Sequence, residues 1–225
     1  MRKNSKTKLV EAEKVAVELF ELAQSSGLIK AGKTEKELNV ELFELAKEHF
    51  NIEKHWHKRI VRSGVNTLLP YRDNPSNLTI REDDILFFDF GPILEDWEAD
   101  LGRTYVIGND PVKIKLKEDI ESAWHETKEW FHQQKDITGA TLFQYAVEKA
   151  KEYGWEFGGP IAGHIIGEFP HEELDPEMYD LYVHPENHKS MMTPDENGNQ
   201  RDWILEIHFV DREKEIGGFF EQLLT

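Results

Sequence analysis

The first fifty residues carry apolar side chains at the spacing of amphipathic helices, every three or four positions along the chain. The apolar positions are Leu9, Val15, Ala16, Leu19, Phe20 and Ala23, followed by Leu38, Leu42, Ala46 and Phe50. Gly27 is a natural stop for the first helix. Thr34, with Glu37 three residues later, has the pattern of a capping box that opens the second helix. This part of the chain therefore predicts two helices within 8–50.

Beyond residue 56 the helical spacing gives way to short runs rich in β-branched and aromatic residues, the composition of strands. These runs occupy 57–69, 79–80 and 85–107, and turn residues separate them, namely Gly64, Asn74-Pro75 and Gly91-Pro92. Helical spacing returns from Glu118 to Tyr153, where Gly154 stops it. Strand-like runs then follow at 161–166, 203–210 and 218–223.

The order of helix, helix and strands thus occurs twice, although no residue-level repeat accompanies it. Duplication of this kind favours one α+β domain over 1–225, in which helices cover the outer face of a shared, mainly antiparallel sheet. We expect residues 1–55 to supply the N-terminal helices, 56–110 the first strand half, and 118–225 the second helix and strand half.

Composition narrows the function. The chain of 225 residues has 27 basic and 44 acidic residues and a net charge of −17, which argues against nucleic acid as a partner. It has no cysteine, so disulfides, thiolate catalysis and cysteine-ligated zinc are excluded. The basic N-terminus leads into a charged, amphipathic stretch, and we expect neither a signal peptide nor a membrane partner. The cytoplasm is the expected location.

Four acidic residues stand inside apolar runs, where a carboxylate is costly unless something neutralises it. Asp89 ends the run 85–88 and Asp100 lies where the chain returns, while Glu206 and Glu221 belong to two later strands. Because alternate side chains of a strand face opposite ways, acids on neighbouring strands can point at one place. Taken singly, each acid is better explained by an edge position or a local ion pair. The four together favour bound metal.

Two histidines stand between the acid pairs. His164 lies on an apolar strand, and His171 follows seven residues later. Two divalent cations would cancel the four negative charges, and one imidazole ligand would make the site softer than an all-oxygen magnesium site. His171, next to Pro170, is explained either as a surface histidine or as a neutral group on the substrate side of the metals.

In their order along the chain, these motifs resemble the pita-bread metallohydrolases, a family that includes methionine aminopeptidase, aminopeptidase P, prolidase and creatinase. The matching motifs are Asp89-Phe90-Gly91, Asp100 with Arg103-Thr104, Gly163-His164 with Gly167, His171-Glu172, Glu206 and Glu221. The resemblance implies an α+β pita-bread fold with a curved, mainly antiparallel sheet and outer helices. Within the family, the chain most resembles the catalytic domain of aminopeptidase P, without the N-terminal domain of that enzyme.

The resemblance also implies a ligand set. Asp89 would chelate one metal, Asp100 and Glu221 would bridge two, and His164 and Glu206 would complete the second. The implied cofactors are two divalent metal ions, manganese first, with cobalt, iron or zinc as alternatives.

The implied chemistry is hydrolysis. A hydroxide that bridges the two ions would be the nucleophile, because paired metals lower the pKa of bound water. Glu206 would also move protons, and His171 would donate a hydrogen bond to the developing oxyanion.

Three residues depart from the family pattern and leave the substrate open. Tyr71 stands where a histidine usually follows the Gly-x-Asn segment, and Pro160 stands where proline-specific members have a histidine. Phe219 stands where an arginine often precedes the last glutamate. Tyr71 and His57 are candidate substrate contacts. For His57, however, two alternating histidines that lead into a strand favour a surface or sheet position.

The first functional hypothesis is a dinuclear-metal aminopeptidase of the Xaa-Pro type, acting on a peptide or small amide. The second is creatinase-like hydrolysis of a C–N bond in a small molecule, and the third is a non-catalytic binding protein on the same fold. The long segment 173–200 favours a lid or a subunit contact. A homodimer stays open.

Overall fold

The computed structural model describes residues 2–171 and 178–225, with side chains from residue 5 onward. Its α-helices are α1 (Arg2–Ser25), α2 (Glu35–Phe50), α3 (Pro111–His132) and α4 (Gly139–Tyr153). The strands are β1 (Ile60–Ser63), β2 (Ile85–Phe90), β3 (Ile93–Leu94), β4 (Trp97–Glu98), β5 (Leu101–Val106), β6 (Glu156–Phe157), β7 (Ile165–Ile166), β8 (Asp202–Asp211) and β9 (Ile216–Leu223). Short 3₁₀ helices cover Gly64–Leu68 and Tyr179–Leu181.

The ends of the helices follow from local hydrogen bonds. At the start of α2 the predicted capping box is confirmed: the Glu37 N–H donates to Thr34 Oγ1 at 3.2 Å, and the Thr34 N–H donates to Glu37 Oε2 at 2.8 Å. Gly154 ends α4 with a φ of 85°, a left-handed conformation that glycine adopts without strain. α3 begins at Pro111, earlier than the predicted 118, because Asp110 caps its first turn.

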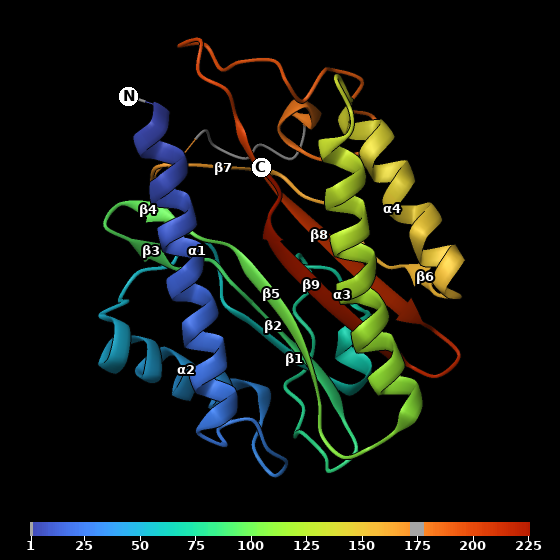
Figure 1. The fold of residues 1–225 in the computed structure, drawn as a ribbon. Coiled ribbons are helices and arrows are strands. Elements are labelled where there is room, and N and C mark those ends of the chain that lie inside the picture. Colours follow the sequence, from blue (N-terminus) through green and yellow to red (C-terminus); the bar gives the residue numbers. More distant parts are fainter. Residues whose placement is uncertain (1, 172–177) are drawn as a thin grey trace.

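The sheet joins both halves of the chain. Its strand order is β1-β2-β5-β9-β8-β6, with β7 paired to β8, and every pairing is antiparallel (Figure 1). The halves meet where Gly102 of β5 lies opposite Glu221 of β9. Gly102 is required there, since a Cβ would lie 2.5 Å from the Phe219 ring.

Two of the predicted strands are shorter than expected. Within 57–69 only Ile60–Ser63 is strand, and the chain then turns into the 3₁₀ helix at Gly64, whose φ is 53°. Within 161–166 only Ile165–Ile166 is strand, because Gly163 has a φ of 137° that breaks the extended run. Composition predicted these strands, and glycine geometry shortened them.

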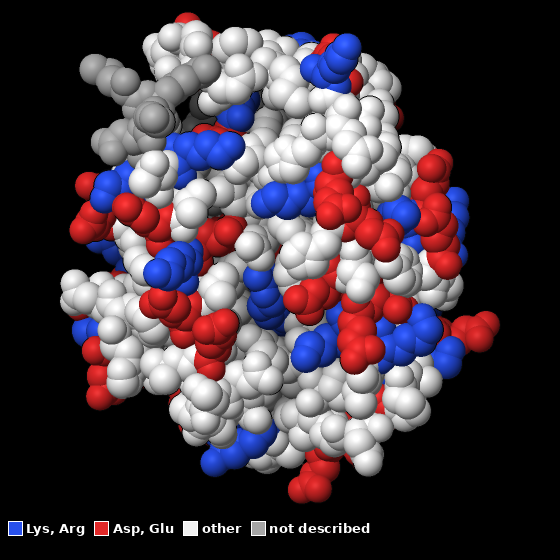
Figure 2. Space-filling view, viewed as in Figure 1, with Lys and Arg blue, Asp and Glu red and all other residues white. Residues whose placement is uncertain are grey.

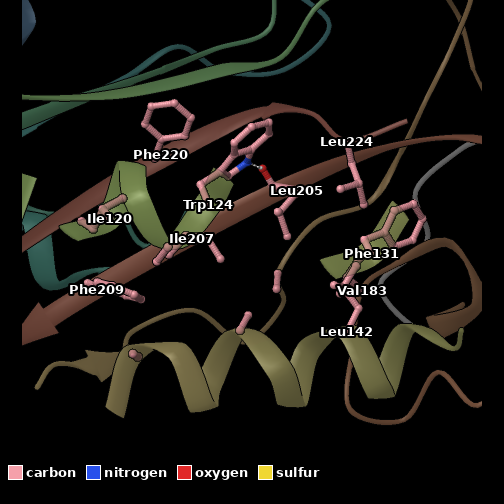
Figure 3. Close-up of a cluster of buried hydrophobic side chains, with 14 of the residues drawn as sticks. Ile120, Trp124, Phe131, Leu142, Val183, Leu205, Ile207, Phe209, Phe220 and Leu224 are labelled. Carbon is pink, nitrogen blue, oxygen red and sulfur yellow. Dashed lines mark hydrogen bonds between the residues drawn. The ribbon is translucent and has the colours of Figure 1, made fainter. Parts of the chain in front are cut away.

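The helices cover one face of the sheet, with α1 and α2 over the first half and α3 and α4 over the second (Figure 1). On β2, Phe88 and Phe90 point to this side and lie edge-on to Phe20 of α1, with ring centroids 5.5 and 5.7 Å apart. Over the second half, Trp124 of α3 is buried and its indole N–H donates to the Leu205 carbonyl at 2.8 Å (Figure 3). The predicted order of helix, helix and strands, and the outer position of the helices, are confirmed.

The opposite face of the sheet carries the polar residues. Since Phe88 and Phe90 face the helices, strand alternation turns Asp89 the other way. On β8, Leu205 and Ile207 pack in the helix-side core, so Glu206 between them faces away from it. The same holds for Glu221, which follows the core residue Phe220 on β9. One concave region between the two halves therefore receives acids from both.

Acidic and basic side chains are interspersed on the face seen in Figure 2. None of the helices in the described part of the chain has the length and apolarity needed to cross a membrane.

Candidate metal centre

A cavity of about 750 Å³ opens on the face of the sheet opposite the four α-helices. All five predicted metal ligands line it, namely Asp89, Asp100, His164, Glu206 and Glu221. They come from separate segments of the chain, so the sheet is what brings them together. His171, Tyr71 and His57 line the same cavity.

Strand register sets the positions of the acids. Glu206 and Glu221 are direct partners across the β8–β9 pairing, on the same face of the sheet. Asp89 lies opposite Gly102, which in turn lies opposite Glu221, and Asp100 immediately precedes β5. The four carboxylates thus stand on β2, β9 and β8 and at the start of β5, which lies between β2 and β9.

The side chains form two groups that share Asp100. In the first, His57 Nε2 lies 3.1 Å from Asp100 Oδ1 and 3.6 Å from Asp89 Oδ1. In the second, His164 Nε2 lies 3.2 Å from Asp100 Oδ2 and 3.9 Å from Glu221 Oε1. In each group the potential ligand atoms lie within 4.8 Å of one another. Each group therefore has the size of one metal site.

Burial and neighbouring charges shift the pKa values of the four acids. Burial, with repulsion from Asp100 and Asp89, raises the pKa of Glu221 well above its ordinary value. Burial likewise raises the pKa of Glu206 to about 8 and that of Asp89 to about 7. For Asp100, burial alone would raise the pKa, but the charge of His57 and the hydrogen bond from His164 lower it below its ordinary value. In the metal-free chain, three of the four acids are therefore protonated more readily than they would be in water.

The pKa values of two histidines in the site are raised as well, but by neighbouring charges and against the effect of burial. Burial alone lowers the pKa of His57, but the charges of Asp100 and Asp89 outweigh it and raise the pKa to about 9. The pKa of His164 is raised as well, since its hydrogen bond to Asp100 and the charge of that carboxylate outweigh burial. In the metal-free chain, both rings therefore favour the positively charged form beside the acids.

The residues fit divalent metal ions. Glu206 Oε1 and Glu221 Oε2 are buried and have no hydrogen-bond partner within residues 2–171 and 178–225. A buried carboxylate oxygen without a partner is costly, and a cation is a direct way to satisfy it. The combination of carboxylate oxygens with imidazole nitrogens suits manganese, iron, cobalt or zinc better than magnesium.

His171 lies at the edge of this group, held by a buried acid. Its Nδ1 contacts Glu98 Oε2, and the Glu98 carboxylate is enclosed in the protein. The Trp56 ring packs against the rings of His57, His164 and His171, with centroids 4.4, 5.4 and 5.2 Å apart. The indole N–H of Trp56 donates to the Ala99 carbonyl at 3.0 Å, which fixes the indole between the three imidazoles.

The three residues that depart from the family pattern all line the cavity: Tyr71, Pro160 and Phe219. Phe219 forms an apolar wall with Ile60 and Phe87. Tyr71 is 44% exposed, and its hydroxyl accepts a hydrogen bond from the Lys58 N–H at 3.2 Å.

Part of the expected lid falls outside the described residues, namely 173–177, as does Glu172 of the His171-Glu172 motif. The described remainder of the segment contributes Tyr179, Tyr182 and His184 to the cavity wall.

Sequence reasoning missed two members of this site, Trp56 and Glu98, which were not assigned a role. His57 was named as a candidate substrate contact, although its position favoured a surface or sheet residue. In fact the two neighbouring histidines separate: His55 packs against the Phe43 and Phe90 rings, while His57 reaches the acids. Residues two apart on an extended chain lie on the same side, so nothing in the sequence signalled this separation. The bend at Trp56 and His57 is what turns the two rings apart.

Comparisons with known proteins agree with this geometry. The sequence profile of metallopeptidase family M24 matches residues 7–197. No curated protein matches the chain significantly.

Among solved structures, a prolidase from Thermococcus sibiricus matches 99% of this chain and 59% of its own, with 22% identity and a TM-score of 0.76. An X-Pro aminopeptidase from Thermotoga maritima matches 99% of this chain and 61% of its own, with 23% identity and a TM-score of 0.73. The chain thus spans about three-fifths of these two proteins. A methionine aminopeptidase from Rickettsia prowazekii matches 99% of this chain and 93% of its own, with 16% identity and a TM-score of 0.71.

Proposed function

The chain belongs to metallopeptidase family M24, and from this premise we propose that it is a metal-dependent hydrolase that removes the N-terminal residue of a short peptide. Its α+β fold is the predicted pita-bread fold. The observation that carries the proposal is the convergence of Asp89, Asp100, His164, Glu206 and Glu221 on one cavity, with two carboxylate oxygens unpartnered among the described residues.

In this proposal the five residues hold two divalent ions, with manganese first and cobalt, iron or zinc as alternatives. When bound, such ions activate water for attack and polarise the scissile carbonyl. The four acids supply the charge that retains the ions, and His164 presents Nε2 because its Nδ1 is bonded to the Ile165 carbonyl at 2.7 Å.

Two side chains handle protons and charge. Glu206 lies on β8 and lines the cavity, and in this proposal it moves protons as well as holding metal. The contact of its Nδ1 with Glu98 holds the His171 ring in place. In this proposal His171 donates a hydrogen bond from Nε2 to the oxygen that becomes negative in the transition state, which requires a proton on Nε2.

The cavity also supports a class of substrate. The wall of Ile60, Phe87 and Phe219 can receive an apolar side chain or a proline ring. Two of the structural neighbours are a prolidase and an X-Pro aminopeptidase, which favours Xaa-Pro peptides as the first substrates to try.

The proposal is tested by metal content and peptide turnover together. The purified chain, supplemented with manganese and desalted, should retain two metal equivalents by elemental analysis and release N-terminal residues from a panel that includes Xaa-Pro peptides. Asp100→Ala should lose both metal and turnover, because Asp100 belongs to both ligand groups. As a matched control, Asp110→Ala removes a carboxylate that only caps α3 and should retain metal.

A wild-type chain that retains no metal would contradict the proposal. A chain that binds metal but releases no residue from any peptide would exclude the aminopeptidase activity, and hydrolysis of a small amide would then be the next assay.

A further inference from the structure

We propose that His57 is a sixth metal ligand, so that each of the two ions has its own imidazole nitrogen. The inference rests on the proposed metal-dependent function. It assigns to His57 a role that differs from substrate contact.

Distance is the first argument. Metal–nitrogen and metal–oxygen bonds of roughly 2.0–2.2 Å place ligand atoms on one ion about 3 to 3.5 Å apart. His57 Nε2 is 3.1 Å from Asp100 Oδ1 and 3.6 Å from Asp89 Oδ1. The corresponding separations for His164 Nε2 are 3.2 Å to Asp100 Oδ2 and 3.9 Å to Glu221 Oε1. His57 is thus as well placed between its two acids as His164 is between its own.

The second argument is the hydrogen bond made by the other ring nitrogen, Nδ1. A histidine that binds metal usually donates its other N–H to a carbonyl or carboxylate, which fixes the tautomer and the ring orientation. His57 Nδ1 lies 2.8 Å from the Lys58 carbonyl oxygen, and His164 Nδ1 lies 2.7 Å from the Ile165 carbonyl oxygen. In both cases the acceptor belongs to the next residue. Both side chains are 8% exposed.

The third argument is that the surrounding chain is built around the ring. A Cβ on Gly91 would lie 2.2 Å from His57 Cδ2, so only glycine leaves room for the imidazole. The adjacent Trp56 holds the same loop in place, since its backbone N–H donates to the Gly91 carbonyl at 2.9 Å. The glycine of the Asp89-Phe90-Gly91 motif thus makes space for a ring aimed at Asp89 and Asp100.

Two matched groups result, each with one imidazole and two carboxylates, sharing Asp100. A nitrogen donor at both positions favours zinc or cobalt over manganese or magnesium, more strongly than a single histidine would. The alternative is that His57 only holds Asp100 in position by a hydrogen bond. That role would affect every metal alike.

The two roles are separated by comparing metals. Metal-free full-length chain is titrated with Zn²⁺ and with Mn²⁺ by calorimetry, using wild type and His57→Gln, which keeps a hydrogen-bond donor but loses the imidazole. We expect one of two Zn²⁺ affinities to fall about 100-fold in the variant, the upper range for losing even an outer-shell partner. The Mn²⁺ affinity should fall much less. His208→Gln is the matched control, because this buried histidine has its Nε2 on the Thr67 carbonyl at 2.8 Å.

Equal losses for both metals, or no loss for either, would overturn the inference and leave the proposed function intact. A wild-type chain that binds neither metal would overturn both. If His57→Gln fails to fold, pulsed EPR of Mn²⁺ bound to His164→Gln provides the second measurement. Coupling to a directly bound nitrogen would support His57 as a ligand, and its absence would refute it.

Discussion

In the metal-free chain, the stability of this protein should fall as the pH rises from 5 to 8. Three of the groups responsible are Glu206, Asp89 and His57, whose pKa values in the folded metal-free chain are about 8, 7 and 9, against ordinary values of 4.5, 3.8 and 6.5. Glu221 and His164, whose pKa values are also raised, act in the same sense. A group with a raised pKa binds more protons folded than unfolded, so raising the pH penalises the folded state. Asp100, whose pKa is lowered, acts in the opposite sense, but only below its ordinary value of 3.8.

The size of the effect follows from these values. One pKa unit corresponds to about 1.4 kcal/mol, so the raised pKa of Glu206 costs roughly 3 kcal/mol between pH 5 and 8. Asp89 and His57 add about 2 kcal/mol each when treated alone. Because the three groups interact, their separate costs do not add, and we expect a total on the order of 5 kcal/mol.

The measurement is urea denaturation of the EDTA-treated chain at pH 5, 6, 7 and 8. Glu206→Gln cannot ionise at this position and should lose roughly 3 kcal/mol less over the same range. Saturating Mn²⁺ should reverse the trend, because metal binding requires deprotonated carboxylates. A free energy of unfolding that is constant or rises from pH 5 to 8 in EDTA would refute the reasoning.

Three further variants test the mechanism and the fold. His171→Ala should keep its metal by elemental analysis but lose about 10²- to 10³-fold in turnover, and normal turnover would remove His171 from the mechanism. Trp124→Phe should cost about 1–3 kcal/mol in urea denaturation, because the Leu205 carbonyl loses its donor in the core. Gly163→Ala should cost more than about 3 kcal/mol by the same assay, because a Cβ would lie 2.0 Å from the Ile204 carbonyl oxygen; wild-type stability would contradict this.

The helices and the two central hairpins were predictable because their signals are local. The capping box of Thr34 and Glu37 and the glycine after Tyr153 are read directly from neighbouring residues. The start of α3 was missed because its cap, Asp110, precedes the apolar stripe by several residues. Strands were predicted too long where glycines turn the chain, since composition does not show backbone conformation.

The ligand positions were also predictable, as carboxylates placed inside apolar strands. Their arrangement was not, since it depends on register: Glu206 lies opposite Glu221 only because β8 and β9 pair as they do. Glu98 illustrates the limit. Nothing around it in the sequence distinguishes it from other acids, and only the fold places it against His171.

The sequence by itself determined the order of elements, the face on which each strand acid lies, and the identity of the groups available for metal. The tertiary structure decided which of these groups meet. His57 is the clearest case, because it is separated by 43 residues from Asp100 and joined to it by a 3.1 Å contact. Periodicity and capping act over a few residues, whereas a site with ligands on several strands depends on pairing between segments far apart in the chain.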